Sequence, residues 1–144
     1  MDSVDIVIVE DNYHDVEMIL DALNESGIIL GFLIFRDGAE AVQHFFDPTG
    51  KFILGKLRPP KLILLDLKLP KINGMEVLKL LKSDDKTKYI PVVVFTSSNE
   101  ARDRKESYKL GVNSYLVKPL DADQFAEHIR QIVNYWFNLN INVD

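Results

Sequence analysis

Short apolar runs alternate along this chain with stretches of helical periodicity. The runs are rich in Val, Ile and Leu and are bounded by turn residues, so they are predicted strands. They lie at 4–10, 28–35, 62–65, 90–96 and 114–117. The intervening stretches repeat apolar residues at helical spacing or end in glycine, so they are predicted helices. A first helix ends at Gly27, and three more lie at 38–46, 74–83 and 100–110. A last helix begins after the cap formed by Asp121 with Gln124.

Five strand–helix units in strict alternation predict an α/β fold. Strands that are apolar on both faces and joined by helices form a parallel sheet with helices on each side. The 144 residues suit one domain, 1–144, with 134–144 as an extension after the last helix. The segment 47–60 has turn residues at both ends and is expected to be a long loop.

Composition narrows the functional classes. The net charge of −5 argues against non-specific nucleic-acid binding and against an anionic membrane surface. No apolar run approaches the length of a membrane span. The absence of cysteine excludes disulfides, thiol catalysis and cysteine-based zinc sites, and it suits a reducing cytoplasm.

Three acids stand at predicted strand ends: Glu10 and Asp11 after the first strand, and Asp66 after the third. In open parallel sheets, ligands bind beyond the carboxyl ends of the strands. If the two strands are neighbours, the carboxylates repel one another unless a cation joins them. An oxygen-only cluster suits Mg²⁺. Each acid alone could merely cap the following helix, but three together predict a metal site.

Two further strand ends add a hydroxyl and an ammonium. Thr96 ends the fourth strand, and Lys118 follows the fifth. Beside a carboxylate and Mg²⁺, these groups would make a phosphoryl site, with Lys118 offsetting charge and Thr96 donating a hydrogen bond. Taken singly, Thr96 could be a helix cap and Lys118 a surface lysine.

Four sequence blocks, in this order and spacing, make the chain resemble the receiver domain of two-component response regulators. They are VEDN (9–12), LLDLKLPKINGMEVL (64–78), PVVVFTSS (91–98) and GVNSYLVKPL (111–120). The resemblance covers nearly the whole chain. It implies a flavodoxin-like (βα)5 doubly wound sheet of strand order 2-1-3-4-5. It also implies a signalling switch rather than an enzyme, with at most slow self-dephosphorylation.

The resemblance also implies roles for the acids. Asp66 would accept a phosphoryl group from a phosphohistidine on a sensor histidine kinase. Asp11, Asp66 and the main-chain carbonyl of Lys68 would bind Mg²⁺, and Glu10 would act through water. The family often has Asn where Lys68 stands, and the extra cation there is expected to tune the phosphoryl lifetime.

Switch residues carry over in the same way. Thr96 would be the switch hydroxyl, Tyr115 the switch aromatic, and Lys118 the family's lysine. The Lys118–Pro119 bond would be cis. The EDN start, the long loop and the aromatic tail make the chain similar to stand-alone regulators of bacterial and cyanobacterial phytochromes, although Tyr13 stands where that group often has proline.

Three alternative functions fit the sequence less well. A pseudo-receiver, meaning an interaction module that is not phosphorylated, is disfavoured because all the implied site residues are present. A flavin or nucleotide enzyme on the same fold lacks the glycine-rich loop it would need after the first strand. An aspartyl phosphatase would need a second acid two residues after its nucleophile, where Lys68 stands.

The tail carries an apolar cluster that can be interpreted in two ways. Trp136 either completes the core stripe of the last helix or belongs to a partner surface. For Phe137, Leu139 and Ile141 the interpretation is an interface, with homodimer pairing through the last helix and tail.

Overall fold

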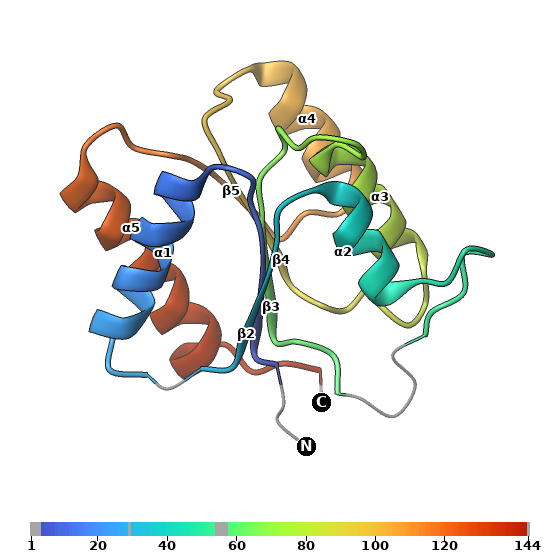
Figure 1. Cartoon of the computed structure of the whole chain (residues 1–144), viewed down its shortest axis with the longest axis horizontal. Helices are drawn as coiled ribbons and strands as arrows, with labels where there is room; N and C mark the ends of the chain where they lie inside the picture. Colours follow the sequence, from blue (N-terminus) through green and yellow to red (C-terminus); the bar gives the residue numbers. More distant parts are fainter. Residues whose placement is uncertain (1–3, 29, 54–57, 144) are drawn as a thin grey trace.

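A five-stranded parallel sheet lies between two layers of helices (Figure 1). The computed structural model describes residues 4–28, 30–53 and 58–143. The strand order is β2-β1-β3-β4-β5, which confirms the flavodoxin-like topology. The elements are β1 Ile6–Val9, α1 Tyr13–Glu25, β2 Phe32–Phe35, α2 Gly38–Phe45, β3 Leu62–Leu65, α3 Gly74–Ser83, β4 Val92–Thr96, α4 Ala101–Leu110, β5 Ser114–Val117, α5 Ala122–Asn134 and a π-helical turn, Tyr135–Leu139.

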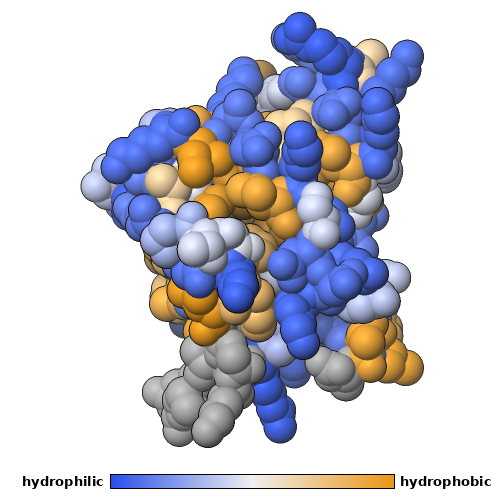
Figure 2. Space-filling model, turned by 90° about the vertical axis from the view of Figure 1, so that its right-hand side faces the viewer, coloured by the Kyte–Doolittle hydropathy of each residue, from blue (hydrophilic) through white to orange (hydrophobic). Residues whose placement is uncertain are grey.

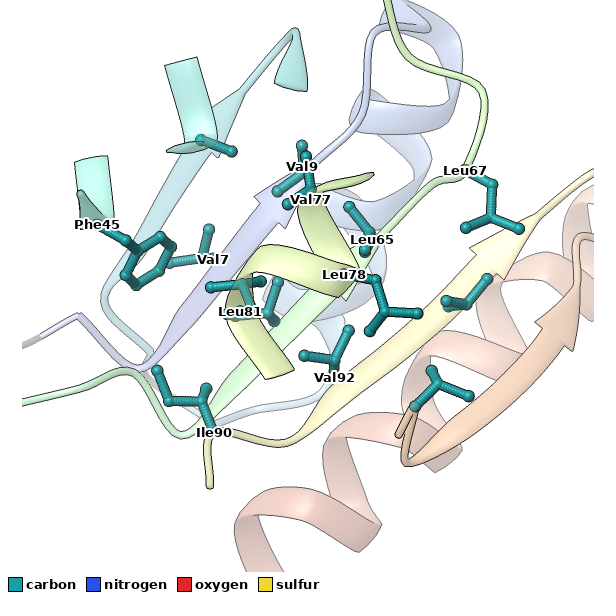
Figure 3. Packing of buried hydrophobic residues seen from close by; sticks show 14 of the residues in the cluster. Val7, Val9, Phe45, Leu65, Leu67, Val77, Leu78, Leu81, Ile90 and Val92 are labelled. Carbon is teal, nitrogen blue, oxygen red and sulfur yellow. The ribbon is translucent and has the colours of Figure 1, made fainter. Parts of the chain in front are cut away.

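Each face of the sheet carries its own apolar core. Alternate residues of a strand point to opposite faces, so Val7 and Val9 of β1 pack under α2 and α3 (Figure 3). Ile6 and Ile8 of the same strand pack on the other side, against α1 and α5. The central strands β1, β3 and β4 are therefore buried throughout. This two-sided burial explains why their sequences are continuous apolar runs without alternation.

Several segments depart from the predicted bounds. The second strand, expected at 28–35, is confined to Phe32–Phe35, with residue 29 outside the described residues. It pairs only with β1, whose four residues limit the ladder. The first and fourth strands are likewise shorter than predicted, whereas 74–83 and 114–117 match. The expected loop 47–60 contains an isolated bridge between Phe46 and Phe52, and its residues 54–57 lie outside the described part.

Side-chain caps fix where the helices begin at the carboxyl edge of the sheet. Asn12 accepts a hydrogen bond from the N–H of Asp15 at 3.0 Å, and Asn73 accepts one from the N–H of Glu76 at 3.0 Å. Asp121 caps α5 through the N–H of Gln124, as the sequence predicted. An acid at the third helical position also interacts favourably with the helix dipole.

The tail turns back on its own domain before it becomes exposed. Trp136 and Phe137 are half-buried against the core between α1, α5 and the sheet. Phe137, predicted to belong to an interface, thus also packs against its own domain, and its part in an interface stays a prediction. Leu139 and Ile141 remain exposed, at 64% and 93%. Within the described residues, no helix is both long and apolar enough to cross a bilayer.

Candidate functional site

Three carboxylates converge at the carboxyl edge of the sheet. Because Val9 of β1 is in register with Leu65 of β3, the residues that follow these strands emerge side by side. Glu10, Asp11 and Asp66 each offer an oxygen, and these oxygens lie within 4.8 Å of one another. An oxygen-only set of three acids suits a hard divalent cation, which would also relieve their mutual repulsion.

The three acids differ in their surroundings. Glu10 and Asp66 are buried, whereas Asp11 is exposed. Burial and the neighbouring charge of Asp66 raise the pKa of Glu10 to about 7, against the opposing effect of Lys118. Glu10 also accepts a hydrogen bond from the N–H of Asn12 at 3.1 Å. Its side chain is thus anchored, and Asp11 provides the solvent-facing member of the set.

Lys118 closes the acid cluster from the side of β5. Its ammonium donates to Glu10, to Asp15 at 2.7 Å and to Asp66 at 3.1 Å. Burial works against the charged form, but the carboxylates of Asp66, Asp15 and Glu10 raise the pKa of Lys118 above its ordinary value. The lysine side chain is only 8% exposed. A cation held this way lies where it can meet negative charge that forms on Asp66.

The predicted switch residues lie on the two neighbouring strands. Thr96 is fully buried at the end of β4, and its carbonyl accepts from the N–H of Lys118 at 2.7 Å. Its hydroxyl oxygen accepts the N–H of Ser98 at 3.4 Å. The hydroxyl of Tyr115 donates to the carbonyl of Ser98 at 2.9 Å. The backbone of Ser98 therefore contacts both the hydroxyl of Thr96 and the hydroxyl of Tyr115.

A cavity of mixed polar and apolar lining opens beside Asp11. Its volume is about 480 Å³, and Asp11, Lys68 and Asp103 are among its lining residues. The N–H of Lys68 donates to Asp66 at 3.3 Å, which orients that carboxylate toward the loop. A larger, mostly apolar hollow of about 640 Å³ lies over α2 and α3 and contains none of the three acids (Figure 2).

Sequence reasoning missed two neighbours of the site. Asp15 reaches Lys118 across 103 positions, and nothing local to its helix marks that contact. Arg36, after β2, stacks its guanidinium 3.7 Å from the ring centre of Tyr13. The expected cis bond before Pro119 is wrong for this structure: no cis peptide occurs among the described residues, and trans is the intrinsically preferred form even before proline.

Comparison with known families gives a single clear match. Residues 6–130 match the family model described as the response regulator receiver domain. The matched range contains the five strands, the acids, Thr96 and Lys118.

Individual relatives extend over nearly the whole chain. The probable methanogenesis regulatory protein FilR2 of Methanothrix harundinacea is 36% identical over 94% of this chain and 84% of its own length. Response regulator Rcp1 of Synechocystis is 37% identical over 91% of this chain and 87% of its own. Both relatives carry names of regulatory proteins.

Solved structures agree with the fold over the same length. The phosphorylated cyanobacterial phytochrome response regulator RcpA superposes with a TM-score of 0.88 at 35% identity, covering 99% of this chain and 100% of that one. The Mn²⁺-bound form of Rcp1 gives a TM-score of 0.84 at 34% identity, covering 96% and 98%. One relative thus carries phosphate and another a divalent metal.

Proposed function

Since this chain belongs to the response regulator receiver domain family, we propose that it is a phosphoacceptor switch in which Asp66 takes the phosphoryl group. The observation that carries the proposal is the placement of the Asp66 carboxylate between two further acids and the ammonium of Lys118. This arrangement combines a nucleophilic oxygen, a donor set for a divalent cation and a fixed positive charge.

The chemistry is a displacement at phosphorus. A carboxylate oxygen of Asp66 forms the new O–P bond while the bond from phosphorus to the donor breaks, and the electron pair leaves with the donor. Mg²⁺, held by Asp11, Asp66 and the carbonyl of Lys68, would supply charge neutralisation on the phosphoryl oxygens. Glu10 would support it through water. Lys118 and the hydroxyl of Thr96 would contact the phosphoryl oxygens once they are in place.

The natural donor is proposed to be a phosphohistidine on a sensor histidine kinase, of phytochrome type by likeness to the phytochrome response regulator RcpA. The chain would act as a signalling switch in the cytoplasm, with self-dephosphorylation as its only turnover and without DNA binding. The net charge of −5 supports the last point, because a nucleic-acid surface would repel it.

The test is incubation with acetyl phosphate and Mg²⁺, followed by intact mass. One added phosphoryl group per chain is expected, and excess chelator should lower the labelling rate by about tenfold or more because the acids then repel the donor. Asp11→Ala should slow labelling far more than Glu106→Ala, an exposed acid on α4. Equal labelling with and without chelator would refute the metal assignment, and no labelling at all would favour the unphosphorylated interaction module.

Thr96→Ala is expected to separate labelling from switching. The variant should still accept phosphate, because Asp66 and the acids remain. It should show a smaller spectral change at Tyr115, since the hydroxyl that distinguishes the two states is gone. Amide NMR spectra of free and phosphorylated protein provide the measurement. A change as large as that of the wild type would show that Thr96 does not transmit the state.

A homodimer formed through the last helix and tail is the remaining part of the proposal. Leu139 and Ile141 follow α5 as exposed apolar residues, and Tyr135 beside them is 49% exposed. Pairing of two copies through this one face would be isologous, the commonest symmetry for small assemblies. Burial of these side chains would remove apolar surface from water, which favours association.

Leu139→Glu combined with Ile141→Glu is expected to convert dimer to monomer in sedimentation at tens of micromolar, roughly the range where a weak interface shows. Both side chains are exposed, so the fold should survive. Glu127→Gln, on the exposed side of α5, is the control and should leave the dimer intact. A wild type that is monomeric with and without phosphodonor would contradict the dimer.

A further inference from the structure

Lys118 is bound by carboxylates from three separate elements. Glu10 follows β1, Asp66 follows β3, and Asp15 lies in the first turn of α1. An ammonium has three N–H donors, and each is used by one of these acids. Asp15 is itself only 17% exposed at its side chain, so the contact is sheltered from solvent. Asp15 is the partner that no metal or phosphoryl chemistry accounts for.

The three acids differ in their interactions with groups other than Lys118. Glu10 and Asp66 belong to the cluster that suits a divalent cation, so their charge is shared between that cation and the lysine. Asp15 is outside that cluster, and Lys118 is its only ionic partner among the described residues. Its distance to the ammonium, 2.7 Å, is shorter than the 3.1 Å from Asp66. The lysine is thus held from α1 as well as by Glu10 after β1 and Asp66 after β3.

We propose that Asp15 is a positioning residue that fixes the ammonium of Lys118 so that one N–H faces the carboxylate of Asp66. The proposal rests on Asp66 being the phosphoacceptor. When Asp66 becomes an acyl phosphate, Lys118 must meet the phosphoryl oxygens. A tether that the metal cluster does not share keeps the lysine at that point in both states. Asp15 therefore determines how well Lys118 is placed to contact the phosphoryl oxygens, while Asp66 forms the bond to phosphorus.

A purely helical role for Asp15 makes a different prediction. Asp15 occupies the third position of α1 after an asparagine cap, where a negative charge stabilises any helix. Glu76 occupies the same position of α3, after the cap Asn73, and is exposed. Glu76→Gln is therefore a matched control, because it removes the same dipole interaction and touches no lysine in the site.

The first experiment is a double-mutant cycle in metal-free protein. The unfolding constants of wild type, Asp15→Asn, Lys118→Met and the double variant are measured in urea. Asp15→Asn should raise the unfolding constant by a factor that is about tenfold larger with Lys118 present than with methionine at that position. Buried ion pairs couple by such amounts. Glu76→Gln should show the same effect in both backgrounds. Absence of coupling for Asp15 would overturn the proposal.

The second experiment uses protein labelled by acetyl phosphate with Mg²⁺. Asp15→Asn should still be labelled, while its phosphorylation-induced NMR change at Tyr115 should fall by about twofold or more. In the Lys118→Met background, Asp15→Asn should cause no further loss. Two results would refute positioning through the lysine. One is an equal loss of the NMR change in Glu76→Gln, and the other is a further loss when Asp15→Asn is added to Lys118→Met. If wild type is not labelled, the phosphoacceptor function fails, and the metal-free cycle still decides whether Asp15 holds Lys118.

Discussion

We expect Asp66→Ala to abolish labelling by acetyl phosphate while the protein remains folded. Asp66 lies beside the other two acids and Lys118 at the end of β3. Glu10 shares these neighbours, but its carboxylate is also held by the N–H of Asn12. Loss of the nucleophile removes the covalent step entirely. Intact mass after incubation with donor and Mg²⁺ measures the loss.

Stability should change little in the same variant, by about 1 kcal/mol or less, because two effects oppose each other. Asp66 repels Glu10, whose pKa it raises, but it also accepts a bond from Lys118. Urea unfolding and circular dichroism check this. Asp85→Asn, a change at an acid whose side chain is 90% exposed, is the control and should label like the wild type. Residual labelling of Asp66→Ala at the wild-type rate would place the phosphate on another residue.

Gly74→Ala is expected to destabilise the fold by about 3 kcal/mol, although alanine is the better helix former. A β-carbon at Gly74 would lie 2.1 Å from the carbonyl oxygen of Asp66 and 2.5 Å from the Cα of Leu67. Both atoms belong to the backbone, so neither can move aside without shifting the segment that carries Asp66. Labelling should therefore slow together with the loss of stability.

Gly27→Ala separates this clash from the general effect of replacing glycine. Gly27 has φ +75° with nothing within 4 Å of the added carbon, so its replacement should cost about 1 kcal/mol and leave labelling unchanged. Urea midpoints and initial labelling rates compare the two variants. If Gly74→Ala lowers the free energy of unfolding no more than Gly27→Ala does, the loop after β3 can shift to accommodate the added β-carbon.

The alternation of apolar runs and helical stretches determined the α/β class and most element positions. Such signals are local: burial on both faces makes a strand continuously apolar, and a capping asparagine or aspartate defines where a helix starts. Helix 74–83 and strand 114–117 were predicted to the residue for this reason. The strand order came from resemblance to a family, because periodicity does not reveal which strands are neighbours.

Candidate site residues could be predicted where they directly follow strands. Glu10, Asp11 and Asp66 stand at strand ends, and the carboxyl ends of parallel strands meet at one edge. Asp15 could not be predicted, because its meaning depends on the approach of α1 to the end of β5. The same is true of Phe137, whose exposure depends on how the chain turns after α5.

Lys82, near the end of α3, is another residue whose contacts could not be predicted from the sequence. In the sequence it is one more lysine on a surface helix. In the structure its ammonium donates to the carbonyls of Lys88 and Ile90, at 3.0 Å and 2.9 Å, and to the side chain of Asn113 at 2.9 Å. Burial lowers its pKa to about 8. Patterns along the chain thus determined which elements form, whereas contacts between distant elements were decided only by tertiary packing, because a side chain's partners depend on where the neighbouring backbone lies.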